Sequence, residues 1–182
     1  MKGSKKELLR WALADQAFRE ADALAEHIIE SKMDWTSDLF RASVAGVAVS
    51  YCRPFLSSTG LGPLPDDMSQ FTGETNEAQL RETHETLIEA RHKIAAHFDR
   101  NHSEDKFRAG HITLPPSEIR IELEMHRFGV STNATYLNPQ RLIAARHLFA
   151  FQICRVSRCI GLFAIELAKQ EKKLGMFVFQ VP

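Results

Sequence analysis

The residues best suited to chemistry lie in one short segment, LIEARHKIAAHFDR (87–100), which contains Arg91, His92 and His97. An imidazole accepts and releases protons close to neutral pH, so His97 is suited to general base or general acid work. A guanidinium is planar and charged and forms two bonds to an anion, so Arg91 is suited to hold a phosphate or developing negative charge. The segment therefore indicates proton transfer beside an anionic group.

This segment ends a helix that we expect over residues 74–98, in which Arg91 lies on the apolar stripe rather than on the polar face. The stripe consists of Leu80, His84, Leu87, Ile88, Arg91, Ile94, Ala95 and Phe98. An unpaired buried charge is costly, so Arg91 needs an anion nearby. Six residues separate Arg91 from His97, which places them about 120° apart on a regular helix. Either the helix ends near Ala96 and frees His97, or two copies of the segment meet across a dimer.

The rest of the chain predicts the elements that must position this helix. Three more helices are expected: about 5–31, a second between a cap at 35–38 and Pro54, and a long one over 139–173 that Asn138 caps. Residues 57–73 lack a period and predict a loop, either a mobile lid or a crossover. The fold class expected is therefore mainly α, a four-helix bundle that forms a single domain over 1–182.

A small β-hairpin insertion is expected at about 110–136, before the last long helix. Apolar residues alternate there with polar ones, which is typical of a half-buried strand: Ile119, Ile121, Leu123 and Met125. The tail at 176–179 is apolar, and we expect it to pack on the body, on the insertion or on a second copy.

Composition limits the classes of function. The chain of 182 residues has 23 Lys plus Arg and 23 Asp plus Glu, so any contact with nucleic acid must come from a local patch. The three Cys residues lie within expected helices and favour a reducing compartment. The N-terminus does not resemble a signal peptide, and no apolar run is long enough for a bilayer span, so we expect a cytoplasmic protein without a membrane partner.

Polar and sulfur-bearing side chains of the last helix are expected to have ordinary roles. Its arginines do not share one stripe, which indicates that most belong to a solvated surface: Arg141, Arg146, Arg155 and Arg158. Cys154 and Cys159 are expected to pack as small hydrophobic residues.

Arg91, the polar residue His92 and the following His97 resemble the signature of the HEPN superfamily (higher eukaryotes and prokaryotes nucleotide-binding). The segment YCRPF (51–55) is also similar to bacterial members of that family. The resemblance covers about residues 5–173, with the hairpin as an embellishment. HEPN proteins are compact helical bundles, often dimers, found in toxin–antitoxin and antiphage systems, so the resemblance implies a four-helix HEPN-like bundle.

The resemblance also implies metal-independent cleavage of RNA through its own 2′-hydroxyl, without a cofactor. In that reaction His97 is the general base or acid and Arg91 holds the phosphate, while His92 orients a partner or contacts phosphate. Asp99 and Arg53 are supporting candidates, Arg53 because it ends the second helix near the expected RNA groove. The partners implied are RNA or a nucleotide, a second copy in a homodimer with the third helices near the twofold axis, and an antitoxin protein.

One position departs from the family pattern. Some family toxins have a Tyr two residues after the His, the target of a nucleotidyltransferase antitoxin, whereas this chain has Asp99. Regulation by AMPylation of that tyrosine is therefore not expected. Asp99 could instead pair with Arg100 or Arg91, or orient a histidine.

Two other classes of function stay open on the sequence. Arg91 and His97 are also compatible with a non-catalytic HEPN module that binds a nucleotide or a protein. Glu89 and His92 form one Glu-x-x-His pair, as in di-iron bundles, but the chain has no second such pair. His84 and His102 do not add the tight spacing of a zinc site, so a metal-binding bundle ranks third and no metal ligand is assigned.

Overall fold

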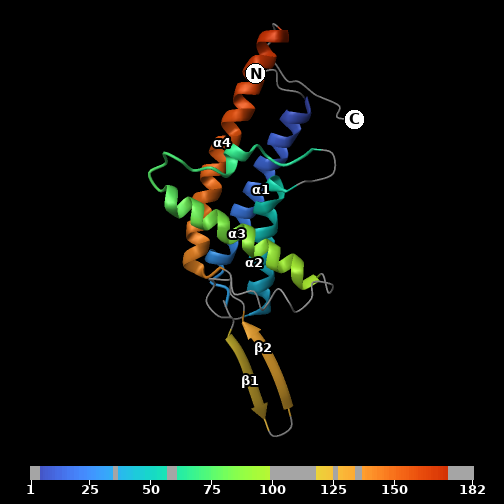
Figure 1. Ribbon diagram of the computed structural model, residues 1–182, viewed down its shortest axis with the longest axis vertical. Helices are drawn as coiled ribbons and strands as arrows, with labels where there is room; N and C mark the ends of the chain where they lie inside the picture. The colour runs from blue at the N-terminus through green and yellow to red at the C-terminus, as the bar shows by residue number, and fades with distance from the viewer. Residues whose placement is uncertain are drawn as a thin grey trace.

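The computed structural model describes residues 5–34, 37–56, 61–98, 118–124, 127–133 and 137–171. Within these residues the chain is mainly helical, as expected, with the α-helices α1 (Lys5–Glu30), α2 (Asp38–Cys52), α3 (Glu77–Phe98) and α4 (Pro139–Glu171) (Figure 1). Between α2 and α3 lie two 3₁₀-helices, η1 (Arg53–Phe55) and η2 (Asp66–Ser69). The strands β1 (Glu118–Glu124) and β2 (Arg127–Asn133) pair antiparallel, with Glu124 opposite Arg127.

Side-chain caps begin two of the helices, where backbone N–H groups lack helical partners. The hydroxyl of Ser37 accepts a hydrogen bond from the Phe40 N–H at 3.1 Å and starts α2. The Asn138 side chain accepts from the Arg141 N–H at 2.8 Å, and Pro139 occupies the first position of α4. Both caps were predicted from the sequence, and both are confirmed.

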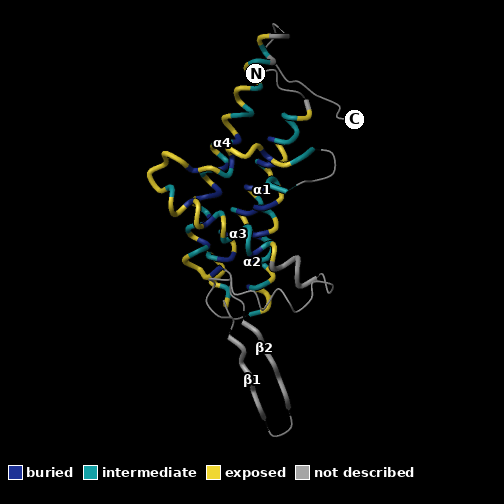
Figure 2. Tube along the Cα trace, in the orientation of Figure 1, coloured by how far each residue is buried: buried dark blue, intermediate teal, exposed yellow. Residues whose placement is uncertain are grey.

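Apolar stripes on the helices meet to form the core, which Figure 2 shows as buried positions along the inner sides of the elements. The stripe expected for α2 is buried along its whole length: Phe40, Val44, Val47 and Tyr51. Helix α3 adds Leu80 and Leu87, and α4 adds Leu142, Leu148 and Phe149. Because full burial of one such side chain is worth about 1.5–3 kcal/mol, these stripes determine which face of each helix turns inward.

The long helices α1 and α4 form the largest interface, while α1 also packs on α2 and α3 lies across α2 and α4 (Figure 1). Arg146 of α4 joins α4 to α1, since its guanidinium lies 2.8 Å from carboxylate oxygens of both Asp22 and Glu26. Arg146, one of the four arginines of which most were expected on a solvated surface, thus remains partly exposed but is ion-paired with α1. Because α3 crosses α2 and α4 steeply, its first and second halves have different neighbours, which matters for the site.

Residues 61–72, which we call the strap, pack on the helices rather than standing free. Three of its apolar side chains are buried: Leu64, Met68 and Phe71. Gly62 at its start and Gly73 just after it have positive φ angles of 74° and 87°, a region that favours glycine. Of the two alternatives for this loop, the described residues fit a packed crossover.

Cationic and amide side chains hold the strap through its carbonyl groups. Arg10 donates to the Leu61 carbonyl at 2.6 and 3.1 Å, and Gln152 donates to the Met68 carbonyl at 2.9 Å. Arg155 donates to three strap carbonyls, those of Asp67, Met68 and Gln70, at 2.9, 3.2 and 3.1 Å. Arg155, another of these four arginines, therefore has a role that the sequence did not indicate, because its charge lies at the end of η2.

Among the described residues, one helix is long and apolar enough to cross a membrane by length and composition alone. It is the segment Pro139–Glu166 of α4. The expectation that the chain has no such segment is therefore wrong on composition. Part of this segment belongs to the core, where Leu142, Leu148 and Phe149 are buried against the other helices.

Candidate functional site

The first half of α3 is fixed by buried contacts with α2. Leu87 and Ala90 are buried, and the Cys52 thiol donates to the Leu87 carbonyl at 3.4 Å. Burial raises the pKa of Cys52 to about 12, and the positive charge of Arg91 opposes that rise. Cys52 is therefore an inert thiol packed in the interface, and Arg91 lies close enough for its charge to act there.

Arg91 is half-buried at the edge of this interface, one turn after Leu87. Its neighbour His92 is exposed, which fits the polar second position of the expected motif with a side chain that reaches solvent. The apolar stripe thus continues as far as Arg91, and there the helix face changes from core to surface.

His97 lies within α3, which runs without a break to Phe98. The helix thus ends two residues beyond Ala96, close to the end that the first alternative gave. The side chain of His97 lies outside the described residues, so the angle of about 120° between Arg91 and His97 stays the expectation for a regular helix.

The supporting candidates do not gather around Arg91. Arg53 of η1 is exposed and forms an ion pair with Glu20 of α1, so its charge is already shared with a carboxylate. Asp99 lies outside the described residues, as does the apolar tail at 176–179. At the expected motif, the structure describes the exposure of the Arg91 and His92 side chains on α3.

A pair that the sequence analysis missed lies earlier on α3. The Tyr51 hydroxyl and Nδ1 of His84 are 2.7 Å apart, and Tyr51 is completely buried. Burial lowers the pKa of His84 to about 4 and raises the pKa of Tyr51 well above its usual value. From the sequence, His84 was considered only as a member of an apolar stripe or as a zinc ligand. Tyr51 lies on the apolar stripe of the neighbouring helix α2, and this was the feature from which the pair could have been predicted.

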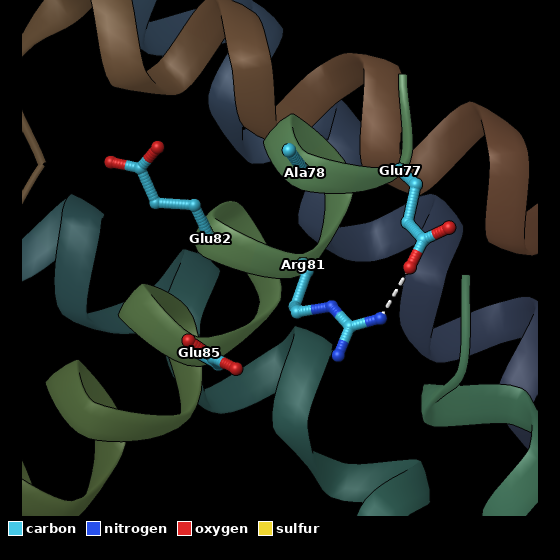
Figure 3. Close-up of a pocket in the computed structure, with 5 residues that line it drawn as sticks. All are labelled: Glu77, Ala78, Arg81, Glu82 and Glu85. Atoms are coloured by element: carbon cyan, nitrogen blue, oxygen red, sulfur yellow. Dashed lines mark hydrogen bonds and ion pairs between the residues drawn. The ribbon is translucent and has the colours of Figure 1, made fainter. Parts of the chain in front are cut away.

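A hollow on α3 is separate from the motif (Figure 3). It is lined by Glu77, Ala78, Arg81, Glu82 and Glu85, all from the first half of α3. Figure 3 shows Arg81 turned to Glu77, with which it forms an ion pair, while Glu82 and Glu85 extend away from it. Because the hollow contains three carboxylates and one guanidinium that is already paired with Glu77, it does not suit a phosphate.

The described residues do not support a metal centre. No group of three His, Cys, Asp or Glu side chains in that part of the chain is placed to hold a metal ion. His84, one of the histidines weighed as a ligand, is engaged with Tyr51 instead.

The cysteines of α4 differ from each other. Cys159 is half-buried and packs against the core, as expected, whereas Cys154 is exposed and the expectation that it packs as a small hydrophobic residue is wrong.

Comparisons with known proteins give no relative. No family model matches the chain, and searches of curated proteins and of solved structures find no significant match. The function is therefore inferred from the residues of α3 and their surroundings.

Proposed function

We propose that this chain is a metal-independent endoribonuclease of the toxin or antiphage type, built on a four-helix HEPN-like bundle with a β-hairpin insertion. The observation that carries the proposal is the arrangement on α3. Arg91 is half-buried where the α2–α3 interface reaches the surface, and the same unbroken helix continues through His97. A partly desolvated guanidinium interacts more strongly with an anion than one fully in water.

The chemistry requires a base, an acid and a group that stabilises charge. A base takes the proton of the RNA 2′-hydroxyl, the 2′-oxygen attacks the adjacent phosphorus, and the bond from phosphorus to the 5′-oxygen breaks. The leaving oxygen receives a proton, so the products are a 2′,3′-cyclic phosphate and a free 5′-hydroxyl. His97 serves as base or acid, and Arg91 holds the phosphorane-like transition state with two hydrogen bonds.

The angular separation of Arg91 and His97 favours a site shared by two copies. If the two residues cannot face one phosphate from a single helix, Arg91 of one protomer and His97 of its partner must supply the site together. A twofold axis near the second half of α3 then gives two equivalent sites in a homodimer. His92, exposed beside Arg91, would contact RNA at this junction.

The other expectations follow from the same proposal. The protein acts in the cytoplasm on RNA, and a cognate antitoxin protein holds it in check. Arg53 would add RNA affinity only after leaving its ion pair with Glu20. The second candidate, a non-catalytic module that binds a nucleotide or a protein, uses Arg91 in the same way but assigns no proton transfer to His97.

The first experiment measures RNA cleavage by the purified protein in EDTA. We expect cleavage with cyclic phosphate ends, and a loss of at least about 100-fold in Arg91→Ala and in His97→Ala, since removing one charge-stabilising group or one proton-transfer group costs on that order. Arg81→Ala and His147→Ala are matched controls on α3 and α4. Binding of RNA without cleavage would move the assignment to the binding module.

The second experiment tests the shared site directly. Arg91→Ala and His97→Ala chains are mixed under conditions that exchange subunits, and cleavage is measured again. Half of the dimers then contain one chain of each kind, and each of these has one intact site, so about one quarter of the wild-type activity should return. If the mixture stays inactive while mass spectrometry shows mixed dimers, the shared site is wrong.

A further inference from the structure

The strap closes over the Tyr51–His84 pair, which the proposed function does not use. Phe71 of the strap meets the His84 ring edge-on, with 5.7 Å between ring centroids. Tyr51 and Phe55 meet the same imidazole in the same way, at 5.8 and 4.9 Å. His84 is therefore the point at which α2, η1 and the strap all contact α3.

The imidazole of His84 lies with its Nδ1 2.7 Å from the Tyr51 hydroxyl. Beside this pair, Gln152 donates from its amide nitrogen to the Met68 carbonyl of the strap at 2.9 Å. The rings of Phe55 and Phe71 enclose the imidazole and keep water from it, so this position favours its neutral form.

Among the described residues, no carboxylate lies in an ion pair with His84 that would stabilise an imidazolium. Tyr51 and Cys52 on α2 are buried and neutral, and α1 contributes the ring of Phe18 through its contact with Tyr51. The positive charge of Arg155 on α4 lies near enough to affect Tyr51. On α3 itself Arg81 pairs with Glu77 and the Glu85 side chain is exposed, while η1 has Arg53 paired with Glu20. Asp66 and Asp67 of the strap are exposed, and no ion pair joins His84 to a carboxylate among the described residues.

We infer that the Tyr51–His84 pair is an acid-sensitive latch for the strap: a proton on the His84 imidazole places a charge beneath the Phe71 ring, and residues 61–72 then leave the helices so that water can reach that charge. The release is local because α1 and α4 keep their own core and the Arg146 ion pairs. The remaining strap contacts, from Arg10 and Arg155 to carbonyl groups, do not change in mild acid. Opening would expose the apolar surface now covered by Leu64, Met68 and Phe71.

Amide hydrogen exchange of the full chain tests the latch at pH 7.5 and 5.5, after correction for the intrinsic exchange rates. The reporter is the N–H group of Leu64, which in the closed strap donates to the Pro54 carbonyl of η1 at 2.7 Å. The pKa of His84 is about 4 when closed and 6.5 when free, so the opening constant should rise about tenfold between these two pH values. Amides inside α1 and α4 should keep their protection.

A matched pair of variants assigns the effect to one residue. His84→Gln keeps a hydrogen-bonding side chain but cannot titrate, so its strap should exchange equally at both pH values. His147→Gln, an exposed position on α4, should retain the tenfold change. Strap protection that ignores pH in the wild type, or that falls together with the protection of α1 and α4, would overturn the latch, as would a pH effect that survives in His84→Gln.

The wild-type protein provides a further check if His84→Gln does not fold. The ¹⁵N shifts of the His84 ring at pH 7.5 should be those of a neutral imidazole. An imidazolium at that pH would overturn the proposal.

Discussion

The same sequence pattern, a polar residue on an apolar stripe, has different surroundings in the two halves of α3. Both halves have a polar residue on the apolar stripe, His84 in the first and Arg91 in the second. His84 lies against the rings of Tyr51, Phe55 and Phe71 and is held neutral by burial. Arg91 lies at the edge of the α2 contact, half-buried beside exposed His92.

The difference arises from where the neighbouring elements end. In the first half, α2, η1 and the strap pack on the inner face of α3. His84 is therefore enclosed and must find a hydrogen-bond partner inside the protein. At Arg91 the neighbouring elements no longer cover the helix completely, since this side chain is half-buried. Its guanidinium can therefore contact an anion from the solvent. A polar residue on an apolar stripe therefore indicates structure or function depending on which elements cross the helix at that turn.

Removing the aromatic partner of His84 should have the largest effect on stability. Tyr51 is completely buried and contacts Phe18, Phe55 and Phe149, with ring centroids 5.2–5.5 Å apart. Tyr51→Ala should lower the free energy of unfolding by about 3–5 kcal/mol, measured by urea denaturation. Tyr51→Phe keeps the ring and should lower it by only about 1–2 kcal/mol. Equal losses in both variants would mean that the hydroxyl, not the ring, determines stability here.

The acid dependence of stability should be intermediate in size. The pKa of His84 falls from 6.5 to about 4 on folding, so the unfolded chain binds the proton more tightly and stability is lost as pH falls below 6.5. Between pH 7.5 and 5.5 this residue should account for a loss of about 1 kcal/mol. Urea curves of the wild type and His84→Gln at both pH values isolate its share; parallel losses in the two proteins would show that other groups are responsible.

The smallest effect on stability is expected at Arg91. Arg91→Ala removes a half-buried side chain at the edge of the interface, so the unfolding free energy should change by less than about 1 kcal/mol. Under the proposed function, the same variant should lose cleavage of RNA. Arg81→Ala, an exposed position on the same helix, is the control. A loss above about 2 kcal/mol would place Arg91 with His84 as a structural residue and remove the contrast between the two halves.

Helix positions and inward faces could be read from the sequence because their signals are local. The caps Ser37 and Asn138 act on N–H groups three residues away, and the α2 stripe from Phe40 to Tyr51 repeats with the helical period. The same locality limited the site prediction. It gave the angle between Arg91 and His97, but it could not give the elements that surround either residue.

What the sequence determined by itself is a mainly helical chain with four apolar stripes and an Arg–His motif on the third helix. Tertiary structure decided the roles of the polar residues on those stripes. It paired His84 with Tyr51, gave Arg155 to the strap carbonyls and Arg146 to Asp22, and left Arg91 at an edge. The physical reason is that a helical period depends on neighbours a few residues apart, whereas a side chain's partner depends on which distant segment crosses the helix at its turn.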